Sequence, residues 1–233
     1  DAKYCCLQKC SFLNSNKFGV AMYIASLTTS LNFISTNDCP ESTNNLPNGA
    51  QFDIHSPTQI TTSNINTTGG TSKYCAGIEY RNSNKGSFKY QTVIKMKGKF
   101  ITSFTKLETN FDISNCNYYN NTVHSDESSS DNPALIHIRD KSVTITDFTF
   151  LKTLFTGSVE DKRKKLIGVN DGNDKPIILI NIYSDIDDPS VRYEGFNIDK
   201  VYNKNDNVGT PFPTFEIEQL NLGECKGLKN PEP

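Results

Sequence analysis

Three histidines carry most of this chain's capacity for proton transfer near neutral pH, namely His55, His124 and His137. His55 follows Asp53, so a carboxylate and an imidazole lie two residues apart. His124 precedes a serine and an aspartate, but only the fold can assemble a catalytic triad. No nucleophile elbow, P-loop, HExxH or dinucleotide glycine motif accompanies them. We therefore expect a non-enzymatic protein, with a hydrolase or nuclease using His55 or His124 as an alternative.

His137 alternates with isoleucines, which predicts a place on the polar face of a strand. Carboxylates gather in two segments that are typical of loops, and we interpret them as ligand-binding surfaces for a basic partner. They are Asp126, Glu127 and Asp131 in the long polar stretch 117–134, and Asp185, Asp187 and Asp188 further on. Asp171, Asp174 and the second group could also bind calcium, although no complete EF-hand loop is present. No other cofactor is expected.

One basic cluster comprises Lys162, Arg163, Lys164 and Lys165. It predicts a weak, salt-sensitive contact with a glycosaminoglycan or another polyanion. A solvated loop or short helix is the alternative. The whole chain has 24 basic and 26 acidic residues and a net charge of -2, which argues against a nucleic-acid-binding protein.

The cysteines and sequons favour a secreted, glycosylated protein from which a signal peptide has been removed. Sequons begin at Asn66 and Asn120. We expect disulfides, with adjacent Cys5 and Cys6 taking different partners, and a metal site as the alternative for this group. An odd number of cysteines leaves one for a bridge between chains. The seven candidates are Cys5, Cys6, Cys10, Cys39, Cys75, Cys116 and Cys225.

Short segments of alternating polarity, separated by turn residues, must position these groups. In residues 88–97, Phe88, Tyr90 and Met96 belong to the predicted inner face. Residues 177–182 are apolar on both sides, which predicts a central strand. Residues 20–34 fit a helix or two strands, and we favour strands. No stretch approaches the length of a membrane span.

These segments predict an all-β fold, a disulfide-stapled β-sandwich with long polar loops and little helix. We expect a single large domain. Residues 1–87 would contribute disulfide-bearing strands, and residues 88–233 would form the main sandwich with a C-terminal strand and tail.

Four segments have a recognisable order: residues 111–116 end in a cysteine, residues 135–140 end in an aspartate, residues 180–185 end in Ser-Asp, and residues 195–198 begin with Gly-Phe. In this order, residues 88–202 resemble a CUB domain, an extracellular jelly-roll sandwich. Residues 111–116 look like a family strand that ends in an acidic turn and a cysteine, and residues 135–140 look like the strand that follows. The resemblance implies a jelly-roll-like sandwich and calcium binding through Asp185, while Ser114 stands where the family has a glutamate.

A secreted β-sandwich without a catalytic signature predicts a binding protein. We expect it to capture an extracellular protein, such as a basic chemokine or cytokine, as a scavenger or decoy. A CUB-like, calcium-dependent adhesion or glycan-binding module is the alternative.

Overall fold

In the computed structural model of this protein, the described residues form β-strands and contain no helix. The structure describes residues 2–13, 22–37, 50–125, 133–139, 143–158, 165–169, 178–186, 197–198 and 201–203. The strands are β1 (Ala2–Leu13), β2 (Met22–Asn37), β3 (Phe52–His55), β4 (Gln59–Thr71), β5 (Cys75–Gly98), β6 (Phe100–Tyr119), β7 (Thr122–His124), β8 (Ala134–Arg139), β9 (Thr144–Leu151), β10 (Leu154–Thr156), β11 (Lys165–Val169), β12 (Ile178–Ser184), β13 (Asn197–Ile198) and β14 (Val201–Asn203). No helix in these stretches could cross a membrane.

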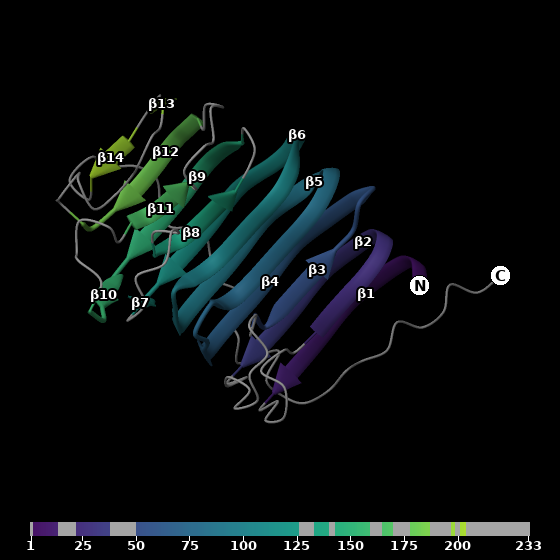
Figure 1. Cartoon of the computed structure of the whole chain (residues 1–233), viewed down its shortest axis with the longest axis horizontal. Coiled ribbons are helices and arrows are strands. Elements are labelled where there is room, and N and C mark those ends of the chain that lie inside the picture. Colours follow the sequence, from purple (N-terminus) through teal and green to yellow (C-terminus); the bar gives the residue numbers. More distant parts are fainter. Residues whose placement is uncertain are drawn as a thin grey trace.

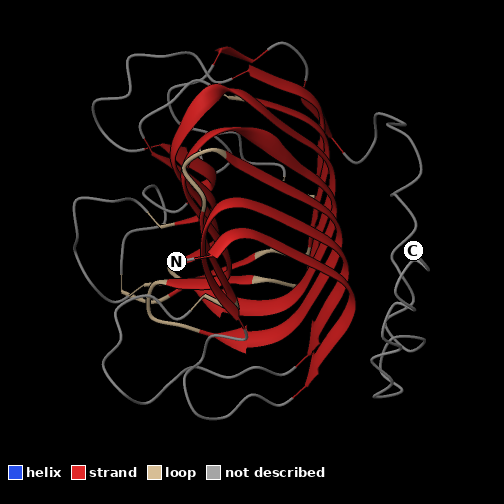
Figure 2. Cartoon of the chain, turned by 90° about the vertical axis from the view of Figure 1, so that its right-hand side faces the viewer, coloured by secondary structure: helices blue, strands red, loops and turns tan. Residues whose placement is uncertain are grey.

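All the strands belong to one sheet, and each recorded pairing is parallel. Ala2 pairs with Ser26, Ile60 with Gly86 and Cys75 with Phe100, so the chain returns to the same position one layer further along. The strands follow one another almost in chain order from β1 to β14 (Figure 1). Viewed from the end of this row, they bend around a common interior (Figure 2). This path defines a parallel β-solenoid.

The interior of the solenoid consists of columns of buried side chains from successive coils. One column contains Ile54, Tyr80, Phe104 and Ile138, which pair in register and are almost inaccessible to solvent. The Tyr80 ring contacts Phe104 at 5.5 Å between centroids, and the Tyr80 hydroxyl shares a hydrogen bond with Thr62. Apolar residues at matching positions therefore bury one another across coils, which is the main stabilising contribution to this fold.

The chain turns at corners where non-glycine residues adopt positive φ. The first corner row contains Asn64, Tyr90, Asn115, Asp147 and Asn181, which occupy equivalent positions in five coils. Asparagine and aspartate tolerate this backbone region better than other side chains. The Asn181 Nδ2 donates to Asp147 Oδ1 at 2.9 Å, so the corner side chains also connect neighbouring coils.

The predicted β-sandwich is wrong, although the prediction of an all-β chain is confirmed. A sandwich needs two packed antiparallel sheets, whereas this chain forms one parallel sheet that closes around its own core. The jelly-roll expected from the CUB resemblance is therefore wrong as well. Strand β5 runs through residues 87 and 88, so the two expected stretches share an element.

The expected disulfide staples are not seen among the side chains that the structure describes. Cys75 and Cys116 are free, buried thiols. Cys116 lies in an inward column between Gln91 and Phe148, whereas Cys75 packs with Ala50, Phe100 and Ala134 in a separate cluster. The side chains of Cys5, Cys6 and Cys10, and the whole of Cys39 and Cys225, lie outside the described part of the chain.

Two predictions of individual elements are confirmed. Residues 22–37 form a strand rather than a helix, although they form one strand, β2, and not the two that were expected. Strand β12 is central, because it pairs with β9 on one side and with β13 and β14 on the other. Leu179 and Ile182 of this strand are fully buried.

Candidate functional site

Four strands of the solenoid, β3, β5, β6 and β8, place polar side chains on the face opposite the core column of Ile54 and Tyr80. Because side chains alternate along a strand, every second residue points away from the core. Two aligned rows result. The deep row is Asp53, Glu79, Ser103 and His137, and the donor row is His55, Arg81, Thr105 and Arg139.

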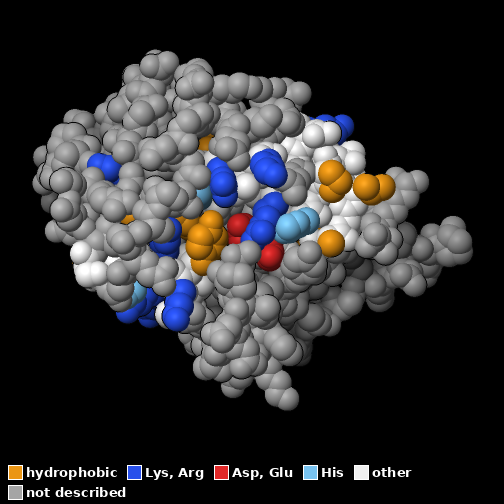
Figure 3. Space-filling view, in the orientation of Figure 1, with side chains coloured by type: hydrophobic (Ala, Val, Ile, Leu, Met, Phe, Trp, Pro, Cys, Tyr) orange, Lys and Arg blue, Asp and Glu red, His pale blue; other side chains and the backbone are white. Residues whose placement is uncertain are grey.

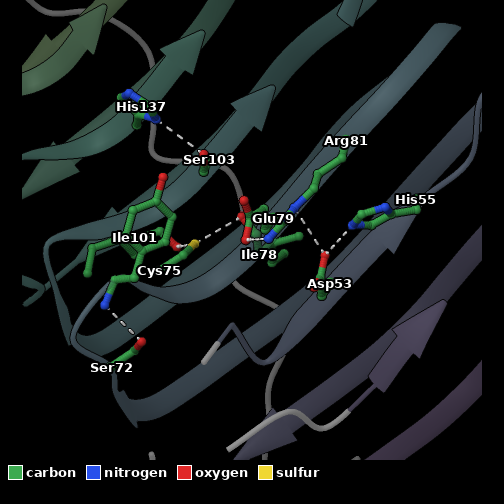
Figure 4. A network of polar contacts seen from close by, with 11 residues as sticks. Asp53, His55, Ser72, Cys75, Ile78, Glu79, Arg81, Ile101, Ser103 and His137 are labelled. Atoms are coloured by element: carbon green, nitrogen blue, oxygen red, sulfur yellow. Dashed lines mark hydrogen bonds and ion pairs between the residues drawn. The ribbon is translucent and has the colours of Figure 1, made fainter. Parts of the chain in front are cut away.

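Arg81 is the centre of an ion-pair network that joins the two rows (Figure 4). Its Nη2 donates to Glu79 Oε2 at 2.6 Å, and its Nε lies 3.5 Å from Asp53 Oδ1. The Asp53 Oδ1 also lies 3.1 Å from His55 Nε2. One guanidinium therefore connects carboxylates from two neighbouring coils.

The side chains of the network differ in how deeply they are buried. The side chains of Asp53 and Glu79 are 10% and 4% exposed, whereas those of Arg81 and His55 are 22% and 28% exposed. Figure 3 shows acidic, basic and histidine side chains side by side near the middle of this face. The carboxylates thus lie beneath the cation and the imidazole, which are the groups that a ligand would meet first.

Burial and ion pairing shift the pKa of two members of this network, Glu79 and Arg81. Burial raises the pKa of Glu79, and the hydrogen bond from Arg81 offsets only part of this effect. Burial alone would lower the pKa of Arg81, but the hydrogen bond and charge of Glu79, together with the charge of Asp53, raise it. Arg81 therefore remains a cation, and the raised pKa of Glu79 makes this carboxylate easier to protonate than one in water.

Ser103 and His137 form a second pair in the deep row. The Ser103 Oγ lies 3.3 Å from His137 Nδ1, and the His137 ring stacks on Phe100 with centroids 4.0 Å apart. The order along the row is Glu79, Ser103, His137, whereas a catalytic triad needs the histidine between the other two. His137 lies on the predicted face of its strand but is 1% exposed, so the pair is a buried structural contact.

The buried cysteines do not have the properties of nucleophiles. The Cys75 Sγ donates to the carbonyls of Ile78 and Ile101 at 3.5 and 3.6 Å. Burial raises the pKa of Cys75, and the charges of Glu79 and Asp53 raise it further. Burial also raises the pKa of Cys116. Both remain thiols, whereas the thiolate is the reactive form.

Of the residues predicted for ligand binding, the structure describes Asp185 and Lys165, and neither belongs to the ion pairs of this network. Asp185 is partly buried, and its Oδ2 accepts from the Lys152 amide at 2.8 Å. Lys165 is buried at the start of β11, where its amide donates to the Pro133 carbonyl at 2.9 Å. Outside the described part of the chain lie Asp126, Glu127, Asp131, Asp171, Asp174, Asp187, Asp188, Lys162, Arg163 and Lys164.

The remaining predicted positions are separated around the solenoid. His124 Nδ1 lies 2.9 Å from Thr156 Oγ1 on the neighbouring coil. Asn66 is 1% exposed within β4, whereas Asn120 is exposed at a corner with φ of 54°. A glycan can therefore be accommodated at Asn120 without unfolding a coil, but not at Asn66.

The sequence did not lead us to predict the ion-pair network, although the spacing of its residues is a signal for it. Asp53 and His55 are two residues apart, as are Glu79 and Arg81. This spacing places each pair on one face of a strand. Only the coil register, in which Asp53 pairs with Glu79, brings the two pairs together.

Metal binding has no support from the described side chains, among which no group of three or more His, Cys, Asp or Glu could hold a metal ion. Calcium binding at Asp185 and the neighbouring carboxylates stays a prediction. No protein-family model, curated protein or solved structure matches the chain. The fold class, a parallel β-solenoid, and the two polar rows are therefore the basis for a functional assignment.

Proposed function

We propose that this protein is a secreted, non-enzymatic binding protein whose donor row holds a linear anionic polysaccharide. The observation that carries the proposal is the alignment of His55, Arg81, Thr105 and Arg139 on successive coils. Neighbouring strands lie about 4.8 Å apart, so the row offers one side-chain donor about every 4.8 Å. A linear polymer with regularly spaced acidic groups matches such a row.

The guanidinium of Arg81 is preorganised for this task. Glu79 and Asp53 hold it from below, while its side chain stays 22% exposed. A fixed guanidinium loses little conformational freedom when it binds a carboxylate or sulfate. The exposed Arg139 at the end of the row adds a second guanidinium group.

The surface of the row favours a polysaccharide over a protein. Protein interfaces usually have a desolvated apolar centre with aromatic anchors. The large exposed hydrophobic residues of the described part are Leu27, Tyr90, Tyr119 and Leu154, and none belongs to the donor row. A row of hydrogen-bond donors without an apolar centre suits a hydrated sugar polymer.

Binding can be tested with dextran sulfate, polygalacturonate and neutral dextran of matched length, by calorimetry at several salt concentrations. We expect the two anionic polymers to bind, with affinity falling as salt increases, and neutral dextran not to bind through this row. Arg139→Gln should weaken binding about tenfold, which corresponds to about 1.4 kcal/mol. Arg81→Gln should weaken it further.

Lys85→Gln is the matched control, because it removes one exposed positive charge from β5 at a position outside the donor row. Equal losses in Arg139→Gln and Lys85→Gln would reduce the effect to general charge and contradict the proposal. Shortening of polygalacturonate during incubation would contradict its non-enzymatic part.

A basic chemokine or cytokine enters the same assay as a competitor. Its capture through Asp126, Glu127 and Asp131 stays a prediction, since these residues lie outside the described part of the chain. Tight binding of the basic protein, with no binding of either anionic polymer, would replace the polysaccharide proposal with the decoy function.

A further inference from the structure

The ion-pair network next to the donor row has unequal numbers of negative and positive charges. Asp53 and Glu79 contribute two carboxylates, and Arg81 contributes one guanidinium. The remaining member is His55, whose Nε2 lies 3.1 Å from Asp53 Oδ1. With a neutral imidazole, these four side chains therefore carry one negative charge in excess, whereas with an imidazolium their charges are balanced.

The charged and titratable residues around His55 come from the strands on both sides of it. Ala25 of β2 and Arg81 of β5 pair with His55. Asp53 attracts an imidazolium at this position, and Arg81 repels one. Histidine is the one residue type in these surroundings that ordinarily changes its charge between about pH 5 and 8. The other titratable residues are Tyr23 in β2, Tyr74 before β5, and Cys75 and Glu79 in β5.

His55 and Arg81 are the members of the network that a ligand can reach most easily. Their side chains are partly exposed, whereas the carboxylates of Asp53 and Glu79 are almost buried. Both side chains extend towards Asp53 from neighbouring strands (Figure 4). Neighbouring strands lie about 4.8 Å apart, so one acidic group of a polymer can contact both donors. The charge of His55 therefore acts directly on an anion held by Arg81.

We propose that protonation of His55 increases the affinity of the donor row for an anionic polymer, so that the protein binds such a polymer more tightly in mildly acidic surroundings. The imidazolium balances the excess negative charge of the network and places a second cation beside Arg81. By linkage, a bound anion favours the imidazolium in return, so binding takes up protons. This inference rests on the proposed function, since it concerns the regulation of the same row.

Protonation of Glu79 acts in the same direction. Burial raises its pKa, so this carboxylate gains a proton more readily than one in water as the pH falls. A neutral Glu79 leaves the positive charge of Arg81 more available to a ligand, because their ion pair is then lost. Substitution of His55 removes the first contribution and leaves that of Glu79, so the two can be measured separately.

The test uses the full chain and dextran sulfate, whose sulfate esters stay ionised throughout the range in which histidine titrates. Calorimetry at constant ionic strength compares binding at about pH 5.5 and about pH 8. We expect the wild type to bind about tenfold more tightly at the lower pH, and His55→Gln to bind within about threefold at the two pH values. His124→Gln is the matched control, because it removes a partly buried histidine of β7 outside the donor row, and it should keep the full change.

His55→Lys is a second variant, in which the charge at this position stays positive over the whole range. At about pH 8 it should bind dextran sulfate within about threefold of the wild-type affinity at about pH 5.5. Calorimetry of the wild type in two buffers of different ionisation enthalpy should show proton uptake on binding, and the uptake should be smaller in His55→Gln. Far-UV circular dichroism checks that each variant is folded at both pH values.

The outcomes separate this inference from the proposed function. Absence of dextran sulfate binding at both pH values would contradict the proposed function and, with it, the role of His55. Binding of equal affinity at the two pH values would overturn the role of His55 and leave the proposed function standing. A change of wild-type size in His55→Gln, or its loss in His124→Gln, would assign the pH dependence to other groups and overturn the inference as well.

Discussion

Replacing Asn121 with alanine should destabilise the solenoid by about 2–6 kcal/mol, because two buried backbone groups lose their partners at about 1–3 kcal/mol each. Asn121 is fully buried. Its Oδ1 accepts from the Met96 amide at 3.0 Å, and its Nδ2 donates to the Val93 carbonyl at 2.9 Å. Strand pairing stops at Ile94 and resumes at Lys97, so this side chain replaces the missing ladder bonds at a corner.

Urea unfolding followed by far-UV circular dichroism measures the loss in the free energy of unfolding. An unchanged m-value would show that the wild type and the variant expose the same amount of surface when they unfold. Asn121→Asp keeps the shape and can accept from Met96, but it cannot donate to Val93, so it should also be destabilised by at least about 1 kcal/mol. Asn84→Ala is the control, because Asn84 is exposed, and it should change stability by less than about 0.5 kcal/mol. A loss below about 1 kcal/mol in Asn121→Ala would refute the role of this side chain in the corner.

Three further changes test the deep row, a tight corner and the thiols. Burial raises the pKa of Glu79 in the folded state, so the wild type loses stability as the pH rises from about 4.5 through that pKa. Glu79→Gln should remove this loss, because glutamine does not titrate. Urea unfolding at several pH values should then show a flatter pH dependence for the variant than for the wild type. Gly86→Ala should cost about 3–5 kcal/mol in the same assay or prevent folding, because its Cβ would lie 1.7 Å from the Ile60 carbonyl oxygen at φ of +154°. Peptide mapping after iodoacetamide treatment should find Cys75 and Cys116 unmodified in the native protein and modified in urea, and labelling of either in the native protein would contradict its burial.

The prediction of strands succeeded because composition and alternation report local backbone preference. Residues rich in threonine, isoleucine and aromatic side chains form β2, β5 and β12. The same features are found in sandwiches and in solenoids. What separates the two folds is parallel pairing at a regular chain spacing. This spacing was difficult to recognise because Ile54, Tyr80 and Phe104 fill one column without being identical.

Tyr90 explains why strict alternation failed within a strand that was otherwise predicted. Phe88 and Met96 are buried as expected, but Tyr90 is exposed. The positive φ at Tyr90 and again at Lys95 turns the chain and changes which residues point inward. Period-two alternation holds only between corners, so it cannot be extended through one.

The candidate site shows the same division between local and long-range information. The sequence shows that Asp53 precedes His55 by two residues and that Glu79 precedes Arg81 by two. This spacing places each pair on one face of a strand. The contact between the two pairs depends on the register of β3 against β5, which places Asp53 beside Glu79 and His55 beside Arg81. The disulfide prediction failed for a related reason, since Cys75 and Cys116 belong to different clusters, and cysteine counts carry no information about distance.

The sequence by itself determined the β-strand content, the central position of β12 and the residue types available for binding, because these depend on local preference and composition. Tertiary structure decided that the strands pair in parallel, that Arg81 connects Glu79 to Asp53, and that the cysteines at positions 75 and 116 are separate thiols. The physical reason is that coil register is a property of the stacked core as a whole. It is set by the cumulative burial of side chains on successive coils, and no short segment contains that information.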